Sequence, residues 1–210
     1  MQKAPQLPRF LFKRLIRFRV FFLPTGSCRQ SEHYEKEGIM NIWIIYASKT
    51  GTTRDCAEKL ATLFSLHRVT CVDIEKEIPD IREADVILVG TSVRMGRIAT
   101  SVRKFLTENH EVLLTVHLGL FLCCGFCDNA ESYFKNNYAA DLLEHADSAM
   151  TFGGEMRVER QKGFDKLIAK LVLRSIASHN RDEDREHDIP LPALIPENIR
   201  RFADEIRSAL

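Results

Sequence analysis

A run of hydroxyl side chains directly follows the first strongly apolar segment of the chain. Residues 42–46 read IWIIY, and the residues after them are Ser48, Lys49, Thr50, Gly51, Thr52 and Thr53. The apolar segment predicts a buried strand, and the residues after it have the spacing of a helix. At such a junction unpaired backbone amides and the helix dipole stabilise an anion. We therefore predict an anion site of the phosphate type here, with a plain cluster of helix-capping hydroxyls as the alternative.

Two further stretches place small and polar residues after an apolar segment. Thr91, Ser92, Val93, Arg94, Met95 and Gly96 follow residues 86–89, and Cys123, Cys124, Gly125 and Phe126 follow residues 116–122. Open α/β sheets bind ligands at the carboxyl ends of neighbouring strands, so the three stretches predict one shared site. The first loop matches neither G-x-G-x-x-G nor G-x-x-x-x-G-K-[ST], which disfavours a dinucleotide fingerprint and a nucleotide P-loop.

The elements that position these stretches alternate between strand and helix patterns. Apolar segments at 42–46, 69–74, 86–89, 116–122 and 149–152 predict strands that are buried on both faces. Helical spacing occurs at 53–64, 102–106, 133–143 and 199–210, and we expect a helix of one or two turns in the connection 75–84. The alternation predicts an α/β fold, a doubly wound five-stranded parallel sheet with right-handed crossovers.

A long insertion separates the last predicted strand from the last helix, and it holds a helical pattern at 162–177. Its apolar stripe is formed by Phe164, Leu167, Ile168, Leu171, Val172 and Ile176, and Lys162, Lys166, Lys170 and Arg174 lie beside it. An apolar stripe edged with cations is typical of a helix that lies on an anionic membrane. Packing against the sheet, with a solvated basic edge, is the alternative.

Residues 1–39 differ in charge from the rest of the chain. They hold eight Lys/Arg and three Asp/Glu, whereas residues 40–210 hold 22 basic and 26 acidic residues. The mildly acidic remainder argues against nucleic acid as a partner. Lys36-Glu37-Gly38 back-translates to a purine-rich sequence of the kind that precedes a bacterial start codon, just before Met40. We expect residues 1–39 to be a mis-assigned start or a disordered N-terminal extension, with a basic membrane-surface anchor as the alternative. Residues 40–210 are expected to form one domain.

The six cysteines form no spaced framework, which fits a reducing cytoplasm. No apolar run approaches the ~20 residues that span a bilayer. The stretch CGFC (Cys124 to Cys127) is interpreted as small residues beside a ligand. A redox dithiol normally follows the first strand of its fold, and a zinc site would need nearby histidines. The sequence indicates no catalytic acid, base or nucleophile and no metal ligands.

The first loop, S-x-T-G-x-T after the first strand, resembles the flavin mononucleotide (FMN) phosphate loop of flavodoxins. The resemblance implies a strand order of 2-1-3-4-5 and FMN as the cofactor, with residues 48–53 at its phosphate. Residues 91–96 and 123–126 would cover the isoalloxazine ring from two sides. Arg94 near the ring would favour the reduced anionic flavin or receive a substrate carboxylate. A surface ion pair with a helix carboxylate is the alternative for this side chain.

Within the flavodoxin-like proteins, GTSVRMG and the tail GGEMRVERQKGFDKLIAKLVL resemble the menaquinone-dependent protoporphyrinogen IX dehydrogenase family. The stretch Cys123-Cys124-Gly125 is closer to ordinary flavodoxins. The resemblance covers about residues 40–210. It implies an FMN-dependent oxidoreductase that passes electrons from a reduced organic molecule, such as protoporphyrinogen IX, to a quinone. Such an enzyme would be cytoplasmic, with peripheral contact to the inner face of the membrane through helix 162–177.

Two other functions remain open on the sequence. The first is a flavodoxin-type electron carrier between protein partners; such carriers usually have a strongly acidic surface around the flavin, and Arg94, Arg97 and Arg103 do not fit one. The second is a flavodoxin-fold interaction module without flavin, which the hydroxyl-rich loop disfavours.

Overall fold

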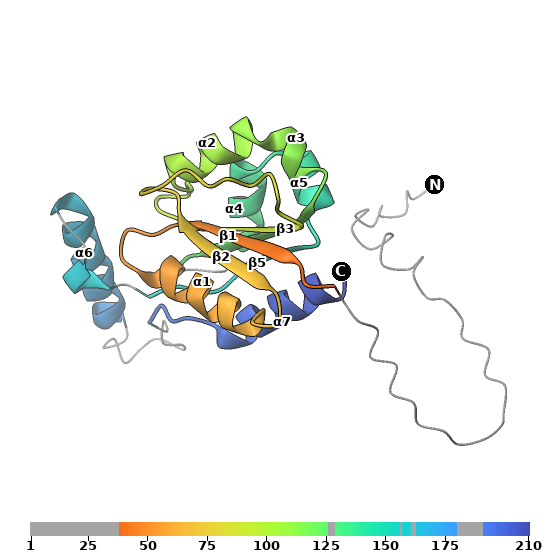
Figure 1. Ribbon diagram of the computed structural model, residues 1–210. Coiled ribbons are helices and arrows are strands. Elements are labelled where there is room, and N and C mark those ends of the chain that lie inside the picture. Colours follow the sequence, from red (N-terminus) through yellow and green to blue (C-terminus); the bar gives the residue numbers. More distant parts are fainter. Residues whose placement is uncertain (1–37, 126–128, 156, 161–162, 180–190) are drawn as a thin grey trace, which may run out of the picture. The chain divides into compact units, whose positions relative to one another are not determined.

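The computed structural model describes residues 38–125, 129–155, 157–160, 163–179 and 191–210. Within residues 39–210 five strands form a parallel sheet of order β2-β1-β3-β4-β5 (Figure 1). The strands are β1 (Asn41–Ala47), β2 (Arg68–Asp73), β3 (Val86–Ser92), β4 (His117–Cys123) and β5 (Ser148–Thr151). The predicted fold class and strand order are confirmed. Residues 1–37 lie outside the described part, so the expected nature of residues 1–39 stays a prediction.

Helices cover both faces of the sheet (Figure 1). One face packs against α1 (Thr52–Leu63) and α7 (Pro196–Arg207), and the other packs against α2 (Thr100–Glu108), α3 (His110–Leu113), α4 (Ala130–Asn137) and α5 (Ala140–His145). The insertion contributes a short 3₁₀ helix, η2 (Val158–Arg160), and α6 (Gly163–His179). Proline at the first position of α7 suits its start, because that amide would have no helical partner.

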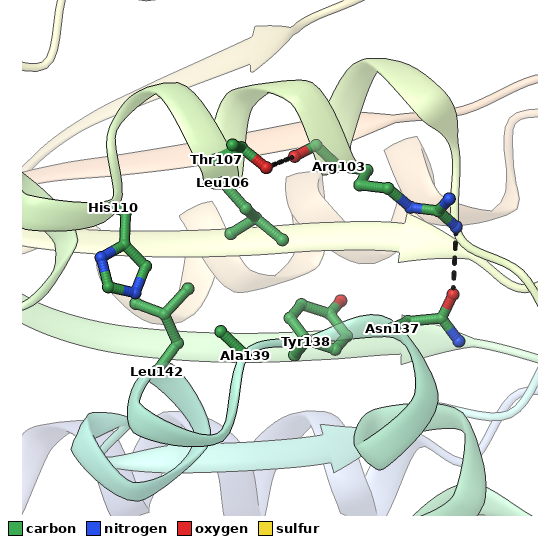
Figure 2. A pocket seen from close by; sticks show the side chains of 8 residues that line it. All are labelled: Arg103, Leu106, Thr107, His110, Asn137, Tyr138, Ala139 and Leu142. Carbon is green, nitrogen blue, oxygen red and sulfur yellow. Dashed lines mark hydrogen bonds between the residues drawn. The ribbon is translucent and has the colours of Figure 1, made fainter.

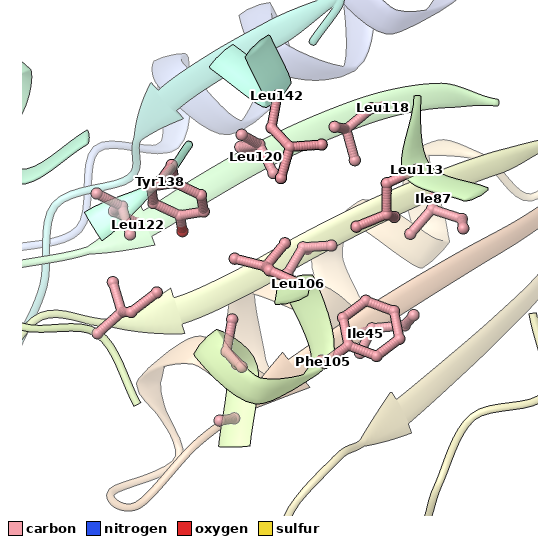
Figure 3. Close-up of a cluster of buried hydrophobic side chains, with 14 of the residues drawn as sticks. Ile45, Ile87, Phe105, Leu106, Leu113, Leu118, Leu120, Leu122, Tyr138 and Leu142 are labelled. Carbon is pink, nitrogen blue, oxygen red and sulfur yellow. The ribbon is translucent and has the colours of Figure 1, made fainter. Parts of the chain in front are cut away.

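Alternating side chains of the central strands build two cores, one on each face. On the α2–α5 face, Ile45, Ile87 and Leu120 pack with Phe105 and Leu106 (Figure 3). On the other face, the fully buried residues include Ile44, Leu88, Phe121, Leu60 and Phe202. The burial of β1, β3 and β4 on both faces confirms what their apolar sequences predicted, and it fixes the carboxyl ends of these three strands side by side.

Strand β2 is less buried than its sequence predicted. Only Val72 of its six residues is buried. The strand lies at the edge of the sheet, and it is paired with β1 alone. An apolar sequence therefore did not distinguish this edge strand from the central ones.

The connection 75–84 contains turns and no helix, so the expected short helix is wrong. Pro79 disfavours helical backbone at the residue before it. Asp80 Oδ1 accepts hydrogen bonds from the backbone amide of Arg82 at 3.3 Å and from its side-chain Nε at 2.8 Å. This local side-chain bonding offers the backbone an alternative to a helix, and it lets Ile81 enter the core.

The single helix expected over 133–143 is divided into α4 and α5. Between them Tyr138 is extended, with φ −119° and ψ 149°. This bend buries the Tyr138 ring next to Phe134, with ring centroids 5.6 Å apart, and lets Leu142 enter the same core. Burial of Tyr138 and Leu142 thus outweighs the continuity of one helix.

The insertion before α7 begins and ends at neighbouring points of the sheet. Gly153 forms an antiparallel bridge with Leu194, and the amide of Ile195 donates to the Phe152 carbonyl at 2.8 Å. The amide of Gly154 donates to the Ala193 carbonyl at 3.0 Å. The predicted helical insertion is confirmed, and α6 lies on the side where β1 ends and α1 begins (Figure 1).

Candidate functional site

The hydroxyl-rich loop lies between β1 and α1, as predicted. Gly51 precedes the helix with φ 92°, a left-handed conformation that favours glycine. Ser48 Oγ accepts hydrogen bonds from the amide of Gly51 at 3.1 Å and from that of Arg54 at 3.3 Å. The loop amides are thus arranged around an acceptor oxygen at a helix N-terminus, the arrangement that binds phosphate in many α/β proteins.

The two threonines that open α1 are almost completely buried. Thr52 is 5% exposed and Thr53 is 1% exposed. Thr52 Oγ1 has no hydrogen-bond partner within the described part of the chain. A buried hydroxyl without a partner costs about 1–3 kcal/mol. A ligand oxygen at this loop would remove that cost, so the loop fits a phosphate group better than it fits a simple helix cap.

The second predicted stretch forms a tight hairpin after β3. Arg94 and Arg97 exchange backbone hydrogen bonds of 2.9 and 3.0 Å, and Met95 and Gly96 at the tip have φ values of 50° and 76°. The Met95 side chain is 89% exposed. Thr91 is buried, and its Oγ1 accepts from the Ala99 amide at 3.2 Å, so this hydroxyl fixes the base of the hairpin.

One side chain from outside the predicted stretches holds this hairpin. Asn137, at the end of α4, donates through Nδ2 to the Gly96 carbonyl at 2.9 Å. Its Oδ1 accepts from the Ile98 amide at 3.1 Å and from Arg103 Nη2 at 3.4 Å. Asn137 was not predicted as a site residue, because its neighbours in sequence form an ordinary helix end, and only the tertiary structure brings it to the loop.

The third stretch lies beside the second. The Val93 amide donates to the Cys123 carbonyl at 2.9 Å, and the Cys124 amide donates to the Gly153 carbonyl at 2.9 Å. A Cβ atom on Gly125 would lie 3.1 Å from Pro192 Cβ, so the end of the insertion packs against this loop. Phe126 and Cys127, and with them the second thiol of CGFC, lie outside the described residues.

The register of the strands brings the three stretches together. Ala47 pairs with Thr91, and Ser92 pairs with Cys123, so the loops after β1, β3 and β4 start in adjacent rows. This is the shared edge that the sequence predicted. Whether each residue contacts a cofactor stays a prediction.

Two buried thiols lie beneath this edge. Cys123 Sγ lies 3.8 Å from Cys56 Sγ in α1. Their hydrogen bond lowers the pKa of Cys56, while the same bond and burial raise the pKa of Cys123. The four described cysteines are free thiols, and the part of the chain that the structure describes holds no cluster of three or more candidate metal ligands.

A separate hollow lies between α2 and the junction of α4 with α5 (Figure 2). Arg103, Leu106, Tyr138 and Leu142 are among the side chains around it. None of the predicted site residues lines it. Its link to the sheet edge is Asn137, which bonds both Arg103 and the hairpin.

A parallel sheet of this order, with three adjacent loops at its carboxyl edge, defines an open α/β protein of the flavodoxin class. The chain matches the flavodoxin domain family over residues 43–184, and it belongs to that family. FMN is the cofactor that this domain implies, in agreement with the first loop. The geometry at Ser48 and Thr52 fits the phosphate of such a cofactor.

Solved structures of similar fold are distant in sequence. A short-chain flavodoxin associated with a non-canonical PDU bacterial microcompartment is 14% identical, with a TM-score of 0.48, over 81% of this chain and 99% of that one. A flavoprotein in complex with FMN from Lactobacillus acidophilus is 18% identical, with a TM-score of 0.40, over 53% and 93%. A flavodoxin, WrbA-like protein from Agrobacterium tumefaciens is 19% identical, with a TM-score of 0.39, over 68% and 98%. No curated protein sequence matches the chain significantly.

Among the residues that the structure describes, no helix combines the length and the apolar character needed to cross a bilayer.

Proposed function

We propose that this protein is an FMN-dependent oxidoreductase that passes electrons from a reduced organic molecule to a quinone. The main support is the phosphate-type loop, whose amides surround Ser48 Oγ and whose Thr52 hydroxyl is buried without a partner in the described residues. FMN would supply the redox chemistry when bound. The role of the chain would be to hold the phosphate with residues 48–53 and to cover the ring with residues 91–96 and 123–126.

Charge near the hairpin favours an enzyme over a protein-to-protein electron carrier. Arg94 and Arg97 form the hairpin itself, and exposed Arg103 lies on α2 close to Asn137. Carriers commonly use an acidic surface to steer their partners, whereas arginines suit a small anionic substrate. On the resemblance of GTSVRMG we propose protoporphyrinogen IX as the first reductant to test, with Arg94 receiving a carboxylate.

The exposed residues of α6 support a second proposal, that the protein binds peripherally to the cytoplasmic face of an anionic membrane. Leu167 and Leu171 are 53% and 54% exposed, and Lys170 and Arg174 are exposed with them, whereas Ile176 is buried. The apolar stripe predicted from the sequence is therefore partly buried and partly exposed; the Phe164 and Ile168 side chains lie outside the described part. Exposed leucines beside cations suit a lipid surface, from which a lipophilic quinone could be reached.

The cofactor and the activity are tested first with the purified full chain. We expect a flavin absorbance spectrum, a released cofactor with the mass of FMN, and anaerobic turnover of protoporphyrinogen IX with a menaquinone analogue. Arg94→Ala should lower turnover, while the exposed Arg200→Ala on α7 should not. Bound FMN without turnover, but with electron transfer to redox proteins, would replace the enzyme by a carrier. A chain that takes up no FMN would overturn both.

The membrane contact is tested by co-sedimentation with vesicles containing anionic phospholipid. Lys170→Glu on α6 should weaken binding, and Lys104→Glu on α2 serves as the matched control because Lys104 is also exposed. Equal binding by both variants, or no binding by the wild-type protein, would contradict the proposal.

A further inference from the structure

Three arginine side chains from two distant parts of the chain converge on the first loop. A Cβ atom on Gly51 would lie 2.7 Å from Arg160 Nη1, 3.4 Å from Arg157 Nη1 and 3.6 Å from Arg54 Nη2. Arg54 belongs to the first turn of α1, whereas Arg157 and Arg160 belong to the insertion. The left-handed backbone at Gly51 favours glycine there, and the missing side chain lets these groups lie beside the loop.

Arg157 fixes the insertion to the first turn of α1. Its Nη1 lies 2.6 Å from Asp55 Oδ2, and its Nη2 lies 2.7 Å from Glu155 Oε2. The Arg157 side chain is only 20% exposed, so these pairs are partly shielded from solvent. Two carboxylates balance this guanidinium, which makes Arg157 a positioning residue rather than an anion ligand.

Arg160 lies one turn of η2 further along, at the loop itself. Its Nη1 donates to the Thr50 carbonyl at 3.4 Å. It lines a cavity with Lys49, Arg54 and Lys76, and the carboxylate on that cavity, Asp73, lies 2.9 Å from Lys76 Nζ. Arg54 also lies 3.6 Å from Asp55 Oδ1 and 3.6 Å from Glu58 Oε1, and Lys76 is paired with Asp73, so Lys49 and Arg160 are the cations on this cavity that favour an anionic ligand.

We infer that the insertion completes the phosphate site of the first loop: Arg160, positioned by Arg157, contacts the phosphate group, and a bound phosphomonoester thereby orders the segment 157–160, which lies against α6. The inference rests on the proposed function, since it assigns the phosphate to FMN. It adds a specificity residue for FMN over riboflavin, which has no phosphate. It also links cofactor loading to α6, the helix proposed above to contact the membrane.

The affinity test compares FMN and riboflavin on the full chain after removal of any bound flavin, with flavin fluorescence as the readout. Because charge-assisted hydrogen bonds to phosphate are among the strong ones, Arg160→Gln should weaken FMN binding by about tenfold or more. Riboflavin binding should stay unchanged, and added salt should weaken FMN more than riboflavin. Arg200→Gln, on an exposed arginine of α7, is the matched control and should alter neither.

The outcomes separate the two proposals. FMN binding that is equally tight in the wild-type protein and in Arg160→Gln would overturn the inference and leave the proposed function standing. Failure of the wild-type protein to bind either flavin would overturn both.

Amide hydrogen exchange supplies a readout that does not depend on activity. We expect FMN, and not riboflavin, to slow exchange in residues 157–160 and 163–179 of the wild-type protein, and we expect Arg160→Gln to lose this protection. Equal protection by both flavins would show that the phosphate does not order the segment. Full protection by inorganic phosphate alone would assign the cavity to free phosphate and overturn the link to the flavin.

Discussion

At Gly90, β3 crosses directly over the ring of Phe121. A Cβ atom on Gly90 would lie 1.9 Å from Phe121 Cζ. The ring cannot move aside easily, because it stacks on Phe152 with centroids 4.7 Å apart and meets Phe202 edge-on at 6.0 Å. A close contact of this kind requires glycine at the position, even though its backbone is that of an ordinary strand.

We therefore expect Gly90→Ala to destabilise the fold by about 1–3 kcal/mol, the usual range for overpacking in a filled core. Urea unfolding followed by circular dichroism measures the change. Gly38→Ala is the control, because nothing lies within 4 Å of a Cβ atom there. Equal unfolding midpoints for the two variants would show that the aromatic cluster can rearrange.

Tyr138 is a buried side chain whose hydroxyl has no partner within the described residues, at the hollow shown in Figure 2. Removing an unsatisfied hydroxyl is neutral or favourable, so Tyr138→Phe should leave stability unchanged or raise it by up to about 1 kcal/mol. Burial raises the pKa of Tyr138. In the unfolded chain this tyrosine ionises at a pH of about 10, whereas in the folded protein it stays protonated above that pH.

The advantage of the phenylalanine variant should thus grow as the pH rises above about 10. Thermal unfolding at neutral and alkaline pH checks this expectation. A variant that is markedly less stable at neutral pH would mean that the hydroxyl has a partner after all, such as a buried water.

At the scale of elements, Asn137 connects α4 to the hairpin of residues 94–97. Loss of its hydrogen bonds would leave the Gly96 carbonyl and the Ile98 amide without these partners. Asn137→Ala should lower stability by about 1–3 kcal/mol and weaken FMN binding, because the hairpin is no longer held. Exposed Asn136 on the same helix provides the control Asn136→Ala. Unchanged hydrogen exchange at residues 94–98 would contradict this role.

An ion pair joins α3 to α5, with His110 Nε2 3.0 Å from Asp141 Oδ2. Their hydrogen bond raises the pKa of His110 and lowers that of Asp141. The stabilisation from His110 is present below its unfolded pKa of about 6.5 and is lost as the pH rises through the higher folded value. The stabilisation from Asp141 is present above its unfolded pKa of about 3.9, and it is lost as the pH falls through the lower pKa of the folded protein.

The contact between α3 and α5 should therefore be strongest between about pH 4 and pH 6.5. His110→Gln and Asp141→Asn should each lower the urea midpoint inside this window, and the double variant should lose little more than either single one. A coupling that is as large at alkaline pH as inside the window would contradict the assignment to a charged histidine.

At the scale of the whole molecule, the sequence was sufficient to locate the strands of the sheet. It was insufficient to predict contacts between residues that are far apart in the chain. Continuous apolar segments located all five strands, and the residues after them located the three loops at the carboxyl edge. Strand β2 was predicted as buried because its sequence is apolar, although the strand order that the family resemblance implied already placed it at the edge. The break at Tyr138 depends on packing that no local pattern contains.

Some residues of the candidate site could likewise be found from the sequence, and others could not. Residues 48–53 could be found because hydroxyls, a glycine and a helix start adjoin in sequence. Arg157, Arg160 and Asn137 could not, because long stretches of chain separate them from the loops that they contact. Both arginines lie in the tail sequence GGEMRVERQKGFDKLIAKLVL, whose family resemblance gave them no role of their own.

The two ends of the insertion are hydrogen-bonded to each other, which affects how the length of the insertion can vary in this family. Because residues 152–154 and 193–195 are already hydrogen-bonded to each other, the chain between them starts and ends at one place. Lengthening such a loop costs little, since the entropy of closing it grows only with the logarithm of its length. This segment could thus change in length or sequence while the five strands and the three loops at the carboxyl edge of the sheet keep their positions.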